Sequence, residues 1–315
     1  MVNHLAILGA NGFIGKSLLK NITLTNKRVV LGVRSPINQA QKGVNTLVSD
    51  YSNPEHFRAL LENTSTLIHC ASGTTVSTSS AHPVREFDAD LRTGLALIEA
   101  LQDRSDIHVI FLSSGGTVYG DQGSARLIRE TDLPKPKSYH GSAKLSIEYF
   151  LRSWATQKSA ALTIVRPSNI FGPGQLYRKD FGVVPALFQA ITNKQKFILR
   201  GAEDTIRDFL YIDDLIDLIS RILDAEHHGR QPIICNAGRG SGTALKDLIR
   251  TVEEVTQRTV EVDIEPALTG EVSSVVLNNE YALKQFGWSP KIDLKSGLEA
   301  NWIWWKEQAD KLEII

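Results

Sequence analysis

A glycine-rich turn near the N-terminus constrains the fold more than any other feature of this 315-residue chain. In LAILGANGFIGKSLLK, Gly9, Gly12 and Gly15 follow an apolar run and open an amphipathic stretch. The first glycine permits a tight turn, the second lets backbone approach a pyrophosphate, and the third allows close packing of helix against strand. The helix N-terminus adds N–H donors and the positive end of a dipole. At a first strand-to-helix turn, this spacing predicts a dinucleotide site.

Apolar runs of strand length alternate with amphipathic stretches through the first half of the chain. This order predicts an α/β fold of the Rossmann type, a doubly wound parallel sheet with helices on both faces. The pattern loosens after about residue 167, where a smaller C-terminal substrate-binding lobe is expected. We assign 1–166 and about 206–238 to the dinucleotide-binding domain, and about 167–205 and 239–315 to the lobe. Strands are expected at 4–9, 28–33, 44–48, 66–71, 107–113 and 161–165.

Charge and cysteine content exclude several classes of protein. The 35 basic residues balance 35 acidic ones without a basic stripe, so neither a nucleic acid nor a membrane surface is an expected partner. No apolar run approaches the ~20 residues of a bilayer crossing, and no signal peptide is apparent. The two cysteines, Cys70 and Cys235, lie in apolar contexts typical of buried thiols in a cytoplasmic protein. The eight histidines show no zinc-ligand spacing, so no metal is expected.

The end of the second predicted strand bears on the choice of dinucleotide. An acidic residue about 20 positions beyond the glycines would bind the ribose hydroxyls of NAD. VVLGVRSP offers Arg34 instead, which could contact a 2′-phosphate and so favours NADP over NAD. An exposed arginine at a strand end is the alternative explanation, and NAD stays open. Asp50, at the end of NTLVSDYS, is placed to accept from the adenine amino group.

Several segments occur in an order that resembles the extended short-chain dehydrogenase/reductase family: GANGFIG, VSDYS, IHCAS, LSSGGTVYGD, RPSNIFGPG and RDFLYIDD. Within it the chain is most similar to UDP-glucose 4-epimerases and related nucleotide-sugar epimerases, dehydratases and reductases. The resemblance covers nearly the whole chain and implies a nicotinamide dinucleotide, a nucleoside-diphosphate sugar and a homodimer. With the glycine turn, it predicts cofactor contacts at Gly9, Asn11, Gly12, Phe13, Ile14, Gly15, Arg34, Asp50, Tyr51, Cys70, Ala71, Ser72, Lys144 and Pro167.

The segment PKSYHGSAKL departs from the family pattern P-x-S-x-Y-G-x-S-K-L at its central position. In the family, a tyrosine and a lysine four residues later carry out the proton chemistry. The alignment places Lys144 at the lysine but His140 at the tyrosine. Tyr139 stands one residue early, and on a helix its side chain would point about 100° away.

A second departure concerns the serine or threonine hydroxyl that assists the family's tyrosine. In FLSSGGTVYGD the expected position falls at Gly115. Ser114 and Thr117 lie on either side of it and could substitute. Asp90 stands where the family has an asparagine. The resemblance places substrate contacts at Thr117, Asn169 and Arg207.

Three interpretations of these departures stay open. In the first, His140 and Lys144 perform acid–base chemistry on a sugar hydroxyl or ketone, since imidazole needs no activation to act as a base near neutral pH. In the second, Tyr139 or another group supplies the proton and His140 only lines the site. In the third, the protein binds its ligands without efficient turnover, as a sensor or scaffold. We therefore predict a nucleotide-sugar epimerase working by C4 oxidation and re-reduction, with an NADPH-dependent 4-keto-sugar reductase and a catalytically impaired homologue as alternatives.

Overall fold

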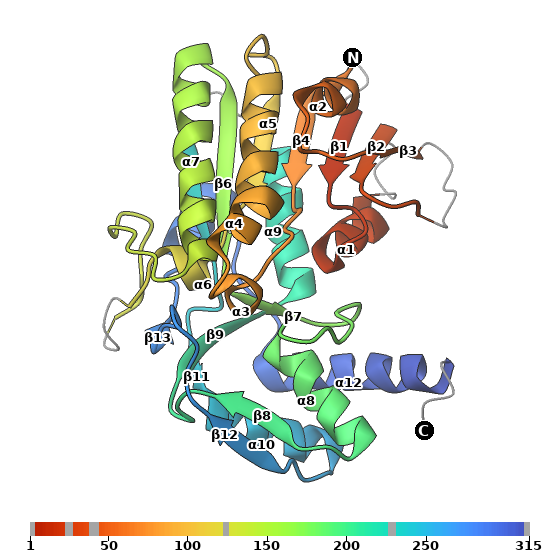
Figure 1. Ribbon diagram of the computed structural model, residues 1–315, viewed down its shortest axis with the longest axis vertical. Helices are drawn as coiled ribbons and strands as arrows, with labels where there is room; N and C mark the ends of the chain where they lie inside the picture. Colours follow the sequence, from red (N-terminus) through yellow and green to blue (C-terminus); the bar gives the residue numbers. More distant parts are fainter. Residues whose placement is uncertain (1–3, 23–27, 38–43, 122–125, 226–230, 312–315) are drawn as a thin grey trace.

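One sheet of seven strands forms the centre of the larger part of the molecule (Figure 1). The computed structural model describes residues 4–22, 28–37, 44–121, 126–225 and 231–311. All six neighbouring pairs of strands are parallel. Along the sheet the order is β10 (Ile233–Ala237), β6 (Ala161–Pro167), β5 (His108–Leu112), β4 (Thr66–His69), β1 (His4–Leu8), β2 (Arg28–Val33) and β3 (Val44–Val48).

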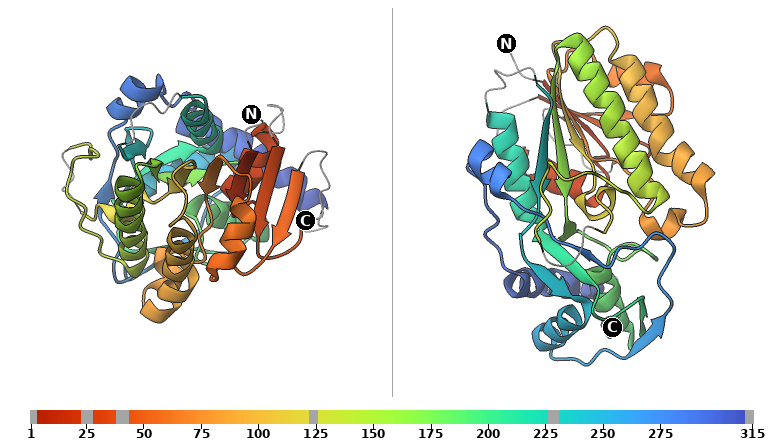
Figure 2. Two further views of the ribbon diagram at one scale, coloured as in Figure 1. Left: turned by 90° about the horizontal axis from the view of Figure 1, so that it is seen from above. Right: turned by 90° about the vertical axis from the view of Figure 1, so that its left-hand side faces the viewer.

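Helices cover both faces of this sheet, which explains why its central strands are apolar along nearly their whole length. On one face lie α1 (Phe13–Ile22) and α9 (Ile212–Asp224), with α11 (Glu280–Phe286) beside α9 (Figure 2). On the other lie α2 (Pro54–Leu61), α5 (Arg92–Ala100) and α7 (Tyr139–Lys158). Each face has its own buried core, with Leu18, Leu215 and Ile219 on the first and Phe57, Leu97 and Leu151 on the second. The predicted doubly wound α/β fold is confirmed.

The smaller part is assembled mainly from segments of the second half (Figure 1). One small sheet contains β7 (Asn169–Phe171), β9 (Ile206–Tyr211), β11 (Gly242–Ala244) and β13 (Ser274–Val275), and a second pairs β8 (Phe197–Arg200) with β12 (Val262–Glu265). Its helices are α8 (Val183–Asn193), α10 (Leu245–Thr256) and α12 (Leu294–Lys311). The segment 206–238 contributes to both parts, since β9 joins the small sheet whereas β10 joins the large one. Among the described residues no helix is long and apolar enough to cross a membrane.

The order of the strands creates a crevice at one edge of the large sheet. From β1 the chain moves outward to β2 and β3, and it then returns to place β4 on the other side of β1. In open α/β sheets, ligands bind at the carboxyl ends of the strands where the winding reverses in this way. After β4 the chain runs through α3 (Val76–Ser79), α4 (Pro83–Glu86) and a π-helical turn, η1 (Phe87–Leu91), before it enters α5.

Candidate active site

A cavity of about 670 Å³ lies at this crevice. Its wall begins at the turn between β1 and α1, follows the carboxyl ends of β2 and β4, and reaches the first turns of α7 and the start of β7. The cavity therefore collects side chains that are far apart in the sequence. Such a position is where the predicted cofactor and substrate would meet.

The glycine turn is shaped so that side chains cannot be added to it. Gly9 has φ +89°, and a Cβ there would lie 2.6 Å from the backbone nitrogen of Ala71. At Gly15 a Cβ would lie 2.6 Å from the Cα of Ala10. The Gly12 N–H donates to the Gly9 carbonyl at 2.9 Å, which closes the turn at the start of α1. A bare backbone surface at a helix N-terminus fits the pyrophosphate of a dinucleotide.

A hydrogen bond joins the residues that follow β2 to this turn. The Asn11 side chain donates to the Ser35 carbonyl at 2.8 Å, and the exposed Arg34 lines the cavity beside it. Across the mouth lies Asp50, where hydrogen bonds from the hydroxyl and backbone N–H of Ser52 hold the pKa of the carboxyl below its ordinary value. A cationic and an anionic side chain thus flank the region where the adenosine half would lie.

Most of the predicted site residues line this one cavity. Of the predicted cofactor contacts, the lining includes Gly9, Asn11, Gly12, Phe13, Ile14, Arg34, Asp50, Tyr51, Cys70, Ala71, Ser72, Lys144 and Pro167, and of the others Ser114, Thr117, Asn169 and His140. Gly15 is absent from it because it packs under the turn. Arg207 lies outside the lining as well, and its guanidinium donates to the carbonyl of Ile206 at 3.0 Å.

The start of α7 decides which of the two candidate side chains faces the cavity. Ser138 caps the helix, its hydroxyl accepting from the Gly141 N–H at 3.1 Å. His140 is 8% exposed and Lys144 3% exposed, and both line the cavity one helical turn apart. Tyr139 is 46% exposed and does not line it. The prediction that Tyr139 could serve in the site is not supported, because the helix rotates it away from the crevice.

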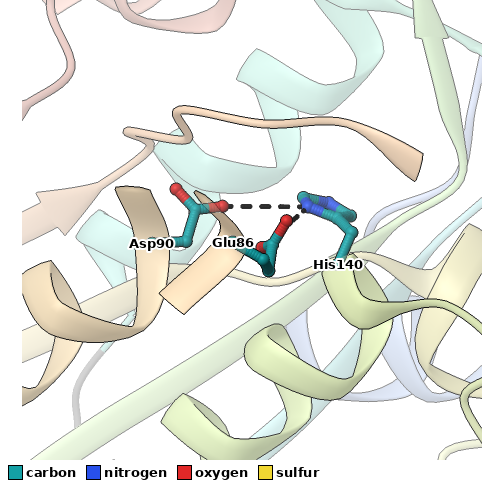
Figure 3. Close-up of side chains that lie close together, drawn as sticks. All are labelled: Glu86, Asp90 and His140. Carbon is teal, nitrogen blue, oxygen red and sulfur yellow. Dashed lines mark ion pairs between the residues drawn. The ribbon is translucent and has the colours of Figure 1, made fainter. Parts of the chain in front are cut away.

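Two buried carboxylates, those of Glu86 and Asp90, lie beside the imidazole of His140 (Figure 3). Its Nδ1 atom is 3.4 Å from Glu86 Oε1 and 3.7 Å from Asp90 Oδ2. Nδ1 also lies 3.2 Å from the hydroxyl oxygen of Thr74, and that hydroxyl is 2.5 Å from Glu86 Oε2. The carboxylates come from the end of α4 and from η1, a π-helical turn of the kind that recurs at functional sites.

Asp90 links this group to Lys144. Its Oδ2 atom is 3.8 Å from the Lys144 ammonium and accepts from the Ser72 hydroxyl at 2.7 Å, while Oδ1 accepts from the Gly73 N–H at 2.6 Å. Burial raises the pKa of Asp90, but Lys144, Gly73 and Ser72 together hold it below its ordinary value. The carboxyl is therefore ionised at neutral pH and forms an ion pair with Lys144.

Glu86, Asp90 and His140 are also close enough to offer three ligand atoms to one metal ion, all within 4.8 Å of one another. Two of the three groups have other partners, although Glu86 Oε1 has no hydrogen-bond partner among the described residues. The Lys144 ammonium supplies a positive charge to Asp90, and the Thr74 hydroxyl lies between Glu86 and His140. A divalent ion here would sit beside an ammonium group, which like-charge repulsion disfavours.

The position of the family's missing hydroxyl has a steric explanation. Gly115 begins the short helix α6 (Gly115–Val118), and a Cβ there would lie 2.5 Å from Leu277 Cδ1 and 2.9 Å from the Arg166 carbonyl oxygen. A serine cannot be placed at 115 without moving its neighbours. Ser114 and Thr117 line the cavity on either side, and both remain candidates for the hydroxyl role.

One lining residue that the sequence did not single out is His69, at the carboxyl end of β4. It is 3% exposed, its ring packs edge-on against Phe111, and neither ring nitrogen has a hydrogen-bond partner among the described residues. Burial, reinforced by Lys144, lowers the pKa of His69 to about 3. Its neighbour Cys70 has its pKa raised to about 12 by burial. Both groups are neutral at pH 7.

The sequence analysis also missed Thr74 and Glu86. A signal was present, because Glu86 and Asp90 stand four residues apart in VREFDADLR, a spacing that places two acidic side chains on one side of a helix. Nothing in that stretch says that the two acids are buried rather than exposed. Thr74 has no motif of its own, since it lies in a loop between β4 and α3.

Comparison with known proteins identifies the family of the chain. A sequence model described as the NAD dependent epimerase/dehydratase family matches residues 5–238. The chain belongs to this family. The dTDP-4-dehydro-6-deoxyglucose reductase of Escherichia coli is 26% identical over 311 residues, covering 94% of this chain and 96% of the relative. The family expected from the sequence is thereby confirmed.

Two solved UDP-glucose 4-epimerases share the fold. The UDP-glucose 4-epimerase of Thermotoga maritima with UDP-glucose superposes with a TM-score of 0.89 at 23% identity, covering 97% of this chain and 99% of that one. The UDP-glucose 4-epimerase of Thermus thermophilus in complex with NAD gives a TM-score of 0.88 at 23% identity, covering 96% and 99%. At these identities the likeness shows the fold, and the activity of this chain has to be argued from its own site.

Proposed function

We propose that this protein is an NAD(P)-dependent nucleotide-sugar epimerase in which His140 and Lys144 take the roles of the family's tyrosine and lysine. One observation carries the proposal. The imidazole of His140 is buried in the wall of the cavity, one turn before Lys144 and within 4 Å of the carboxylates of Glu86 and Asp90. Its surroundings suit a group that gains and loses a proton during a reaction.

The chain's own groups would act as follows on a nucleoside-diphosphate sugar. A nicotinamide dinucleotide held at the glycine turn supplies the two-electron redox chemistry. His140 accepts the proton of the C4 hydroxyl as that carbon is oxidised, and it returns the proton when the ketone is reduced on the opposite face. The imidazolium formed in between is stabilised by Glu86 and Asp90, at 3.4 and 3.7 Å from Nδ1. Lys144 lies 3.8 Å from Asp90 Oδ2 and keeps this ion pair throughout.

A second candidate is one-way reduction of a 4-keto sugar nucleotide with NADPH. Arg34 favours it, because this cationic side chain lines the cavity where an acidic residue would select NAD. The name of the Escherichia coli relative, a reductase, also supports it. In this case His140 donates a proton to the ketone oxygen and is afterwards reprotonated from solvent.

The test combines cofactor identification with matched variants. Mass spectrometry of the denatured protein identifies any dinucleotide that co-purifies, and NMR follows the products from UDP-, dTDP- and GDP-sugars. His140→Ala should lower kcat by roughly 10²–10⁴-fold, the usual contribution of a positioned acid–base group. His140→Tyr, which restores the family's residue, should keep or raise activity. Tyr139→Phe is the matched control, and it should turn over like the native protein.

The results of these experiments distinguish the candidate functions. Interconversion of two sugars without net cofactor consumption supports epimerisation, and stoichiometric loss of NADPH with a 4-keto sugar supports reduction. Tight dinucleotide binding without turnover of any sugar nucleotide would instead support a binding protein. Unchanged kinetics in both His140→Ala and His140→Tyr would rule out His140 as the proton-transfer group.

A further inference from the structure

Glu86 lies behind the catalytic wall rather than in it. The residue is 2% exposed and does not line the cavity, whereas His140, Thr74 and Asp90 all do. It can therefore reach a substrate only through His140 and Thr74. We propose that Glu86, acting through Thr74, is a positioning residue that keeps Nδ1 of His140 protonated and leaves Nε2 as the atom that exchanges protons. This inference rests on the proposed function, in which His140 is the acid–base group.

The hydrogen bonds around Thr74 determine the tautomer. The Thr74 hydroxyl has one proton, and its shortest contact, 2.5 Å, is with Glu86 Oε2, which can only accept when ionised. Donation to Glu86 leaves a lone pair of the Thr74 oxygen facing His140 Nδ1 at 3.2 Å. Nδ1 must then carry a hydrogen, which it donates to Thr74. In neutral histidine the other nitrogen, Nε2, is consequently the base.

The charges of the cluster also support a role for Glu86 beside a protonated Nδ1 of His140. Asp90 has Lys144 as its cation at 3.8 Å. Within the part of the chain that the structure describes, the one cationic partner within ion-pair distance of Glu86 is His140, and Glu86 Oε1 has no hydrogen-bond partner. A buried carboxylate is costly without a counter-ion. Protonation of His140 at Nε2 places a positive charge beside Glu86, at 3.4 Å between Nδ1 and Oε1.

The tautomer of His140 can be determined by NMR whether or not the protein turns over a substrate. In protein labelled with ¹⁵N in its histidine rings, long-range ¹H–¹⁵N correlation distinguishes a protonated ring nitrogen from an unprotonated one. The signals of His140 are assigned as those missing from His140→Ala among the eight histidines. In neutral His140 of the native protein, we expect Nδ1 to be the protonated nitrogen and Nε2 the unprotonated one.

Matched variants then test whether Glu86 acts on His140 through the hydroxyl of Thr74. Thr74→Val removes the hydroxyl and should shift both ring nitrogens towards the other tautomer, whereas Thr74→Ser keeps the hydroxyl and should resemble the native protein. Glu86→Gln should also shift them, because an amide can donate to Nδ1. Glu99→Gln, an exposed glutamate on α5, is the control for the loss of one charge and should change nothing. Circular dichroism first establishes that each variant folds, and Thr74→Val carries the test if Glu86→Gln does not.

Kinetics add a second readout. Glu86→Gln should lower kcat on the order of 10²-fold, the lower end of what acid–base catalysis contributes, with KM little changed because the lost effect belongs to the transition state. A protonated Nε2 in neutral native His140, or ring signals that Thr74→Val and Glu86→Gln both leave in place, would overturn the inference even if His140 proved essential. Conversely, a native tautomer that depends on Glu86 in a protein without turnover would uphold the positioning role and refute the proposed enzyme.

Discussion

The two ends of the cavity are lined by different kinds of group, backbone at one end and ionisable side chains at the other. At the cofactor end, a tight glycine turn and the N-terminus of α1 present backbone, with Gly9 held at φ +89°. At the other end, the proposed reaction end, four ionisable side chains are buried together, Glu86, Asp90, His140 and Lys144. The first end agrees with the family pattern, and the second departs from it. A binding surface made of backbone depends on the conformation of the turn and on its N–H donors, whereas a cluster of buried charges can work only if its members compensate one another.

At the reaction end, the replacement of the family's tyrosine by His140 is matched by the buried carboxylates around it. An imidazole in place of a phenol becomes cationic when it accepts a proton, where a phenolate would have become neutral. Two carboxylates within 4 Å of Nδ1 are suited to that cation. Lys144 alone, facing an isolated imidazole, would oppose its protonation. If the two ends are independent, a substitution at one should leave the properties of the other unchanged.

The largest effect is expected from Gly9→Val, which alters the cofactor end alone. A side chain there is strained at positive φ and meets the Ala71 backbone at 2.6 Å, and together these should weaken dinucleotide binding on the order of 10²-fold. Calorimetric titration with NAD and NADP measures it. Gly116→Ala is the matched control, since a Cβ at 116 meets no atom within 4 Å. Equal binding by both variants would show that the turn does not hold the cofactor.

Gly115→Ser tests the reaction end by restoring the family's hydroxyl where no room exists for it. The clash with Leu277 and the Arg166 carbonyl should cost roughly 1–3 kcal/mol in the free energy of unfolding, as overpacking usually does. Gly116→Ser adds the same atoms in open space and should stay within about 0.5 kcal/mol of the native protein. Urea denaturation compares the two, and equal stabilities would remove the steric explanation for the missing hydroxyl.

His69 predicts a pH dependence of stability. Its folded-state pKa of about 3 lies below the unfolded value near 6.5, so between these values the unfolded chain binds more protons and stability falls as pH falls. At pH 5 the loss from this residue should be about 2 kcal/mol relative to pH 7. Urea denaturation of His69→Leu at both pH values should show a smaller difference than the native protein by about this amount. An identical pH dependence would mean that His69 does not stay neutral.

The smallest effect concerns the choice of dinucleotide. If Arg34 contacts a 2′-phosphate, Arg34→Asp should shift the ratio of NADP to NAD affinity by about tenfold or more towards NAD, since a charge-assisted hydrogen bond is replaced by repulsion. Fluorescence titration with each dinucleotide gives the ratio. Lys16, which also lines the cavity, offers a comparison, because Lys16→Ala should weaken both dinucleotides alike if it serves the shared pyrophosphate. No change in the ratio for Arg34→Asp would refute the 2′-phosphate hypothesis.

The sequence alone determined the doubly wound fold, the glycine turn and the identity of the residue at position 140. These follow from local patterns: the period of apolar residues, glycine spacing, and the 100° step that separates Tyr139 from His140 on a helix. The resemblance to the family predicts Arg207 as a substrate contact, and its side chain lies outside the cavity lining. A residue's position in a motif does not fix its rotamer or its neighbours.

Only the tertiary structure decided what surrounds His140. Thr74, Glu86 and Asp90 lie more than forty residues before it, and they reach it because α3, α4 and η1 pack beside α7. Whether an acid in VREFDADLR is solvated or buried against an imidazole depends on that packing, which no local pattern encodes. The chemistry of a buried charge is set by its neighbours in space, and those neighbours exist only once the chain has folded.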